Sequence, residues 1–164
     1  MNPPQIRAVF DAVVFVQALI SRRGPAAACF DRINAGQAIL FTSDALLDEA
    51  RSVPMRPELT RRYSRLTPER IEAFINAVRA TSVNIPSPPK VFALPRDPKD
   101  EICTDLAVAA SAQFLVTWNE RHLTYLMKQD TPEGKDFCKR FPQLSILNPP
   151  NFLHELDMIH GKTN

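Results

Sequence analysis

Short apolar runs alternate along this chain with segments in which apolar residues recur every three to four positions. The first run, residues 6–10, stops at Asp11, and a helical pattern over residues 13–20 follows at once. Short β-rich runs favour buried strands, and helical spacing favours an amphipathic helix that packs against them. The opening of the chain therefore predicts a strand that presents one carboxylate, Asp11, at its carboxyl end.

The same alternation continues to the end of the chain and predicts one sheet. Strands are expected at residues 6–10, 38–41, 82–85, 114–117 and 144–147. Helices are expected at residues 13–20, 25–33, 44–53, 57–63, 68–78, 96–110, 119–128 and 150–156, and residues 129–142 are expected to be irregular with one turn around Phe137. Strands that alternate with helices, without hairpin signals, predict an α/β fold, a three-layer αβα sandwich around a mostly parallel sheet of about five strands.

Composition fits one globular domain. The chain has 164 residues, 45% of them hydrophobic and 23% charged. We expect an N-terminal extension at residues 1–5, a single domain at residues 6–157 and a frayed tail at residues 158–164. No apolar run approaches the ~20 residues that a membrane span requires, and the first residues lack the layout of a signal peptide. Three cysteines without paired spacing favour a reducing, cytoplasmic location, with Cys29 and Cys103 packing as small hydrophobic residues.

Charge is nearly balanced overall, at a formal +2, which argues neither for nor against nucleic acid. Its distribution is uneven, because six arginines are concentrated in the middle of the chain. Such a cluster can meet phosphates, but it can equally form a solvated helical face with the glutamates between them. The arginines are Arg51, Arg56, Arg61, Arg62, Arg65 and Arg70, and the glutamates are Glu58, Glu69 and Glu72.

A set of acidic and amide side chains falls where a parallel sheet brings segments together. Asp11 closes the first expected strand, Glu49 lies on the helix after the second, Asp100 and Glu101 begin the helix before the fourth, and Asn119 follows that strand. Ligands gather at the carboxyl edge of such sheets. Carboxylates that converge repel one another unless a hard cation such as Mg²⁺ or Mn²⁺ lies between them. We therefore expect an acidic metal site.

Each of these residues also has a simpler interpretation. Asp11 can cap the next helix, Asp100 can serve the start of its own helix, Glu49 can be an ordinary acid on an amphipathic helix, and Asn119 can be a helix cap. A phosphoacceptor receiver domain also carries an acid at a strand end. That class is disfavoured because residues 6–10 contain no acids and no lysine follows residues 144–147.

Four segments in order give the chain a resemblance to a known family. They are AVFDAVVFVQALI with GPAAACFD, LFTSDALLDEARSV with RPEL, LPRDPKDEICTDLAVAASAQFLVTWNERHL, and FPQLSILNPPNFLHEL. In this order and spacing they resemble PIN domains, in particular the VapC-like ribonuclease toxins of toxin–antitoxin systems. The third segment is the most specific of the four.

The resemblance implies a fold, a reaction and a set of site residues. PIN domains are similar to metal-dependent nucleases, and most studied members cut RNA. The resemblance places Asp11 at the first acid, Glu49 at the second, Asp100 or Glu101 at the third and Asn119 at the fourth polar position. It implies Mg²⁺ or Mn²⁺ on these groups, water attack on a phosphodiester, a cognate antitoxin protein as partner and a homodimer by analogy. Ser43 is expected to hydrogen-bond the site.

The chain departs from the family pattern at two places. The common Asp-Thr-Asn motif is here Asp11-Ala12-Val13, so its hydroxyl and amide are missing. The fourth position is Asn119 where the family often has aspartate, and Arg121 stands where a second aspartate is common. Fewer negative charges weaken a site for a hard cation. The alternative function is therefore a catalytically weakened PIN-like module that binds RNA or a protein partner.

Overall fold

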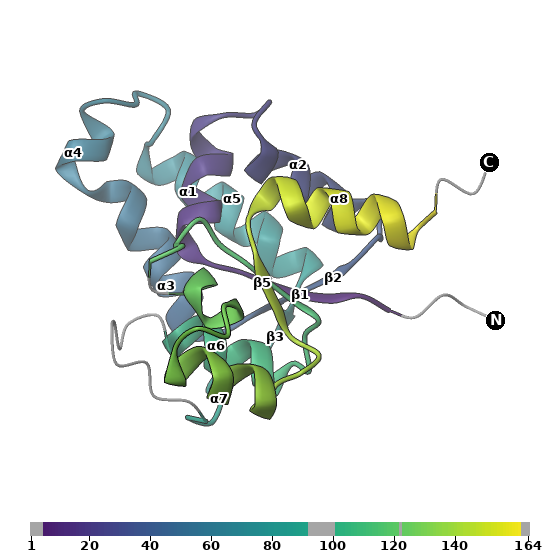
Figure 1. Cartoon of the computed structure of the whole chain (residues 1–164). Helices are drawn as coiled ribbons and strands as arrows, with labels where there is room; N and C mark the ends of the chain where they lie inside the picture. Colours follow the sequence, from purple (N-terminus) through teal and green to yellow (C-terminus); the bar gives the residue numbers. More distant parts are fainter. Residues whose placement is uncertain (1–4, 92–100, 122, 162–164) are drawn as a thin grey trace.

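A five-stranded, wholly parallel sheet forms the centre of the molecule (Figure 1). The computed structural model describes residues 5–91, 101–121 and 123–161. The strand order is β3-β2-β1-β4-β5. The strands are β1 (Arg7–Phe10), β2 (Ile39–Thr42), β3 (Val83–Asn84), β4 (Phe114–Val116) and β5 (Ser145–Leu147). The prediction of an α/β fold around a five-stranded sheet is confirmed.

Helices connect the strands, and several begin at a hydroxyl or amide cap followed by proline. Thr67, Thr131 and Asn148 each accept a hydrogen bond from the backbone three residues on and precede a proline. The α-helices are α1 (Ala12–Ile20), α2 (Pro25–Asn34), α3 (Asp44–Ser52), α4 (Pro57–Thr60), α5 (Pro68–Thr81), α6 (Glu101–Ala109), α7 (Pro132–Arg140) and α8 (Pro149–Ile159), with short 3₁₀ turns η1 (Val53–Met55) and η3 (Thr124–Met127).

An aromatic cluster joins one face of the sheet to its helices. The Phe10 ring of β1 meets Phe30 of α2 at 5.1 Å and Phe152 of α8 at 5.5 Å between ring centroids, in both cases edge to face. Phe30 in turn contacts Phe15 of α1 and Phe74 of α5. Helices α1, α2, α5 and α8 therefore share this core, while α6 and α7 lie on the other side of the sheet (Figure 1).

The last helix is longer than the one predicted over residues 150–156. Helix α8 ends at Ile159, and it is attached to α2 by an ion pair of 2.8 Å between Arg32 Nη2 and Asp157 Oδ1. His160 Nε2 lies 2.6 Å from the Gln37 carbonyl oxygen. Within the described part of the chain, no helix has the length and apolar character that a membrane crossing requires.

All three cysteines are free, and the two expected to pack as small hydrophobic residues are buried. Burial raises the pKa of the Cys29 thiol to about 12. That thiol lies 3.7 Å from the Pro149 carbonyl oxygen, to which it donates a weak hydrogen bond. Cys29 is therefore a packing residue between α2 and α8.

The prediction of a helix over residues 119–128 is wrong, and so is the interpretation of Asn119 as its cap. Among residues 119–121 and 123–128, which the structure describes, the regular element is the 3₁₀ turn η3, whose cap position is Leu123. The backbone N–H groups of Leu123 and Thr124 both bond to the Asn119 carbonyl, which produces a tight turn. Leu123, Tyr125 and Leu126 are buried from this turn, so their burial does not by itself specify an α-helix.

The expectation of irregular structure over residues 129–142 is also wrong, because α7 forms there. Thr131 caps it by accepting from Gly134 N at 3.0 Å, in the same Thr-Pro-Glu pattern that begins α5. Only Gly134 and Phe137 of this helix are buried. A hydrophobic pattern with so few buried positions gives little sign of a helix, whereas the cap does.

We predict that Gly134→Ala destabilises the protein although alanine favours helices. A Cβ atom at this position would lie 2.1 Å from the Lys128 carbonyl oxygen, so the backbone must shift. We expect the free energy of unfolding to fall by about 1–2 kcal/mol, against a gain of about 1 kcal/mol from helix propensity alone. Urea denaturation measures the difference, and an increase in stability would contradict the close approach.

Candidate active site at the carboxyl edge of the sheet

Asp11 lies at the carboxyl end of the central strand, as predicted. It directly follows β1, and its backbone N–H donates to the Val116 carbonyl of β4 at 3.0 Å. Its Oδ1 accepts from Val13 N at 2.7 Å, so it also caps α1. The side chain is only 7% exposed. The cap occupies one carboxylate oxygen, which leaves further lone pairs for another partner.

Thr117 connects Asp11 to the end of β4. Its hydroxyl donates to Asp11 Oδ2 and accepts from Asn119 N at 2.9 Å. Thr117 is fully buried. A hydroxyl therefore reaches Asp11 from the neighbouring strand, although the residue after Asp11 is Ala12. Sequence reasoning missed Thr117, and its signal was a polar residue directly after the apolar strand FLV.

Burial dominates the electrostatics of Asp11. Loss of water around the carboxylate raises its pKa, and the hydrogen bonds from Thr117, Val13 and Val14 lower it by less. Without a further partner, the protein therefore stabilises the ionised form of Asp11 less than water does. A nearby cation would favour ionisation again, and carboxylate oxygens are what Mg²⁺ and Mn²⁺ prefer.

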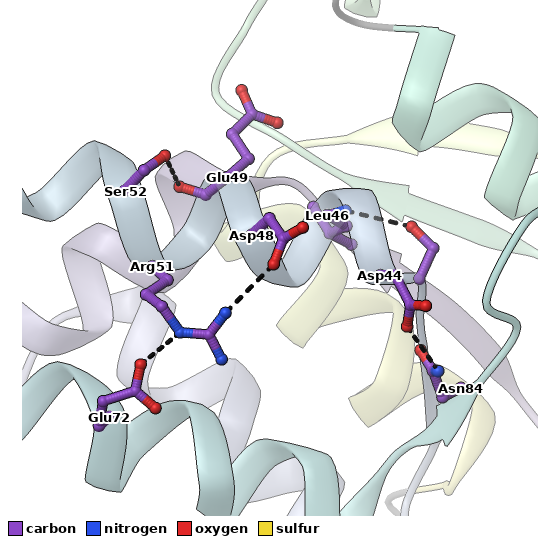
Figure 2. A network of polar contacts seen from close by, with 9 residues as sticks. Asp44, Leu46, Asp48, Glu49, Arg51, Ser52, Glu72 and Asn84 are labelled. Atoms are coloured by element: carbon purple, nitrogen blue, oxygen red, sulfur yellow. Dashed lines mark hydrogen bonds and ion pairs between the residues drawn. The ribbon is translucent and has the colours of Figure 1, made fainter.

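Glu49 follows Asp48 on α3, and Asp48 belongs to an ion-pair network on that helix. Asp48 accepts from Arg51 at 3.2 Å, and Arg51 also pairs with Glu72 of α5. Figure 2 shows the Glu49 side chain pointing away from Asp48 and Arg51. Glu49 is half-buried, whereas Asp44 and Asp48 are exposed.

Helix α3 is fixed at its start by two polar contacts. Ser43 is buried and its Oγ accepts from Leu46 N at 3.2 Å. Asp44 Oδ1 accepts from Asn84 Nδ2 of β3 at 3.0 Å (Figure 2). These contacts set the direction in which the helix carries Glu49. The expected hydrogen bond from Ser43 to the acidic site stays a prediction, because the bond that the structure gives its hydroxyl is the helix cap.

Two acids of α6 line a pocket of about 450 Å³ together with Ser43. Glu101 is half-buried, and Asp105 is only 6% exposed. Asp105 Oδ1 accepts a hydrogen bond from Val91 N at 3.0 Å and so attaches Val91 to α6. Sequence reasoning missed Asp105, because Thr104 and Asp105 are the two polar residues of the mostly apolar stretch ICTDLAVAA and nothing in their spacing indicates a site. Asp100, a predicted ligand, lies outside the described residues.

The structure brings part of the predicted set together. The Asn119 backbone is joined to Asp11 through the Thr117 hydroxyl, and Glu101 lines the same pocket as Ser43. In the ranges 5–91, 101–121 and 123–161, no three Asp, Glu, His or Cys side chains form a group arranged to hold a metal ion. Asp11 fits a hard cation by its chemistry. The complete ligand set stays a prediction, because Asp100 is one of its members.

Comparison with known proteins agrees with this geometry. The family model described as PIN domain matches residues 7–121, more than half of the chain. The match includes β1 with Asp11, α3 with Glu49, α6 and the end of β4 with Asn119. A search of curated proteins gave no match. The chain therefore belongs to the PIN domain family, whose members form part of a nuclease superfamily.

Proposed function

We propose that this protein is an endoribonuclease that uses Mg²⁺ or Mn²⁺ to hydrolyse RNA phosphodiesters. The observation that carries the proposal is Asp11, an acid buried at the carboxyl end of the central strand of a PIN domain. Its pKa is raised by burial, and its two oxygens are oriented by Thr117 and Val13. A buried carboxylate that is costly to ionise is typical of functional sites.

In this proposal Asp11, Glu49 and either Asp100 or Glu101 hold the metal, with Asn119 at the fourth polar position. When bound, the ion supplies a Lewis acid that activates water and stabilises charge on the phosphate. The residues of the chain orient the site: Thr117 fixes the Asp11 carboxylate, and the capped start of α3 directs Glu49. Asn119 is held at this edge by its backbone bond to Thr117.

The biological setting forms a further part of the proposal. Similarity to VapC-like proteins supports the role of toxin in a type II toxin–antitoxin pair, with RNA as substrate, a cognate antitoxin as partner and a cytoplasmic location. Analogy within the family supports a homodimer. A gene for a small DNA-binding protein beside the gene for this chain would support the pairing.

A second candidate is a PIN-like module that binds RNA or protein without cleaving. The observation that favours it is the apolar pair after Asp11. Ala12 is buried and Val13 is 44% exposed, so neither supplies the polar group of the usual motif. Asn119 also replaces a carboxylate. This candidate predicts a correctly folded protein that does not bind Mn²⁺.

Metal removal tests the proposed reaction directly. We expect protein treated with EDTA and then dialysed to leave a labelled single-stranded RNA intact, and added Mg²⁺ or Mn²⁺ to restore cleavage, because the ion supplies the activated water. Gel electrophoresis of the RNA measures the effect. Cleavage that persists in EDTA would indicate a contaminating metal-independent ribonuclease and would contradict the proposal.

Calorimetry with Mn²⁺ separates the two candidates. The nuclease predicts saturable binding that Glu49→Ala weakens, since Glu49 is a proposed ligand. The matched control is Glu58→Ala, which removes the same group from an exposed position on α4. Equal loss in both variants, or no binding by the wild-type protein, would favour the non-catalytic module.

A further inference from the structure

Three arginines from separate parts of the chain line one pocket that the proposed active site does not use. The pocket has a volume of about 510 Å³ and lies between α1, α2 and α5. Arg22 comes from the turn after α1, Arg65 from the segment before α5, and Arg70 from the first turn of α5. Arg22 was not part of the arginine cluster seen in the sequence, and only folding brings it to this pocket.

These three guanidinium groups differ from those of Arg32 and Arg51, which form ion pairs within the protein. Arg51 is paired with Asp48 and Glu72, and Arg32 is paired with Asp157. The side chains of Arg22, Arg65 and Arg70 are exposed and make no ion pair or hydrogen bond with the part of the chain that the structure describes. Their charges are therefore available to an external anion.

The remaining lining gives the pocket a positive balance and an apolar floor. Asp31 is the one acid among its described lining residues, against three arginines. The floor includes Leu19, Phe30 and Phe74. Phe30 is buried within the aromatic cluster, while Phe74 is half-buried and presents part of its ring. The pocket thus combines cations at its rim with a hydrophobic surface below.

We propose that this pocket is a binding subsite for single-stranded RNA, an inference that rests on the proposed function. A phosphodiester carries one negative charge shared by two non-bridging oxygens, which guanidinium groups bind in a bidentate way. An RNA strand presents such a charge at every nucleotide, so three arginines around one pocket suit consecutive phosphates of a strand. The floor around Phe74 accommodates the adjoining ribose or base, as aromatic and apolar surfaces do in proteins that bind single strands.

The test measures binding without cleavage. A fluorescein-labelled single-stranded oligoribonucleotide is titrated with Asp11→Asn protein in EDTA, and fluorescence anisotropy gives the Kd at several salt concentrations. The pocket variant adds Arg22→Gln, Arg65→Gln and Arg70→Gln. The matched control adds Arg23→Gln, Arg61→Gln and Arg79→Gln, which remove the same charge from exposed positions outside the pocket.

We expect the pocket variant to bind RNA about tenfold more weakly or worse, and the slope of log Kd against log salt to fall by about 2. In the control variant the slope should fall by less than about a third of that amount. Equal losses in both variants would show a diffuse charge effect and overturn the proposal. Unchanged RNA binding by the pocket variant would also overturn the proposal. If that variant instead lost affinity only for labelled polyglutamate, titrated in the same way, the pocket would bind an acidic protein partner.

The outcome is independent of catalysis. Wild-type protein that shows pocket-dependent RNA binding but no metal-dependent cleavage would count against the nuclease and leave the subsite in place. RNA cleavage by the wild type, together with RNA binding that does not depend on these arginines, would support the nuclease and overturn the subsite. Thermal unfolding of both triple variants checks that each remains folded, which is expected because all six arginines are exposed.

Discussion

Replacing Asp11 with asparagine should reduce metal-dependent RNA cleavage by about 10³-fold, the order expected when a central electrostatic group of an active site is removed. Asparagine can still accept the hydrogen bond from Val13 that caps α1, and its amide group can donate to the Thr117 hydroxyl oxygen in place of accepting from it. The change therefore removes a negative charge with little effect on local geometry. Single-turnover cleavage of labelled RNA in Mg²⁺ or Mn²⁺ gives the rate.

The same substitution should stabilise the protein when no metal is present. Burial raises the pKa of Asp11 above its ordinary value of 3.8, so the folded protein retains a proton that the unfolded chain releases. The free energy of unfolding of the wild type therefore falls as the pH rises through this window, and it stays lowered at neutral pH. Asp11→Asn lacks this loss, and we expect it to be more stable at pH 7 by on the order of 1 kcal/mol.

Metal should reverse that order. An ion that binds only the folded wild type stabilises it by mass action, and Asp11→Asn should gain far less. Thermal unfolding in EDTA and in Mg²⁺ measures both effects. The control is Asp130→Asn, which makes the same change at an exposed turn and should alter neither rate nor stability. Full activity of the Asp11→Asn variant would contradict the proposed active site.

Replacing Thr117 with valine should have the second largest effect, because valine keeps the shape and removes the hydroxyl. Asp11 Oδ2 then loses its donor, and the Asn119 N–H loses its acceptor. A buried polar group left without a partner costs about 1–3 kcal/mol. We expect the free energy of unfolding to fall by about 2–4 kcal/mol, as measured by urea denaturation.

The pH dependence of cleavage shows whether Thr117 also tunes Asp11. The hydrogen bond from Thr117 lowers the pKa of Asp11, so its loss should raise that pKa further. The acidic limb of the kcat/KM profile should then move to higher pH in Thr117→Val, since fewer molecules carry an ionised Asp11 at a given pH. Thr117→Ser keeps the hydroxyl and should restore the wild-type profile. A loss of stability without a shift in the profile would limit Thr117 to a structural role.

Local patterns predicted most elements of the fold. The apolar runs predicted as strands at residues 6–10 and 38–41 are β1 and β2, and the helix predicted from residue 68 is α5. The predictions failed between residues 119 and 142, where the hydrophobic spacing gives little information about the helices. There a buried turn around Leu123 replaced the expected helix, and the cap at Thr131 began a helix with few buried residues.

The sequence alone determined the alternation of strands and helices and the position of Asp11 at a strand end, because both depend on the spacing of neighbouring residues. Only the tertiary structure decided that Thr117 reaches Asp11, that Asp105 fastens Val91, and that Arg22 shares a pocket with Arg70. The hydrogen bond between Val91 and Asp105 joins residues 14 positions apart, and the one between Thr117 and Asp11 joins residues 106 positions apart. They depend on strand order and helix packing, which local spacing does not specify.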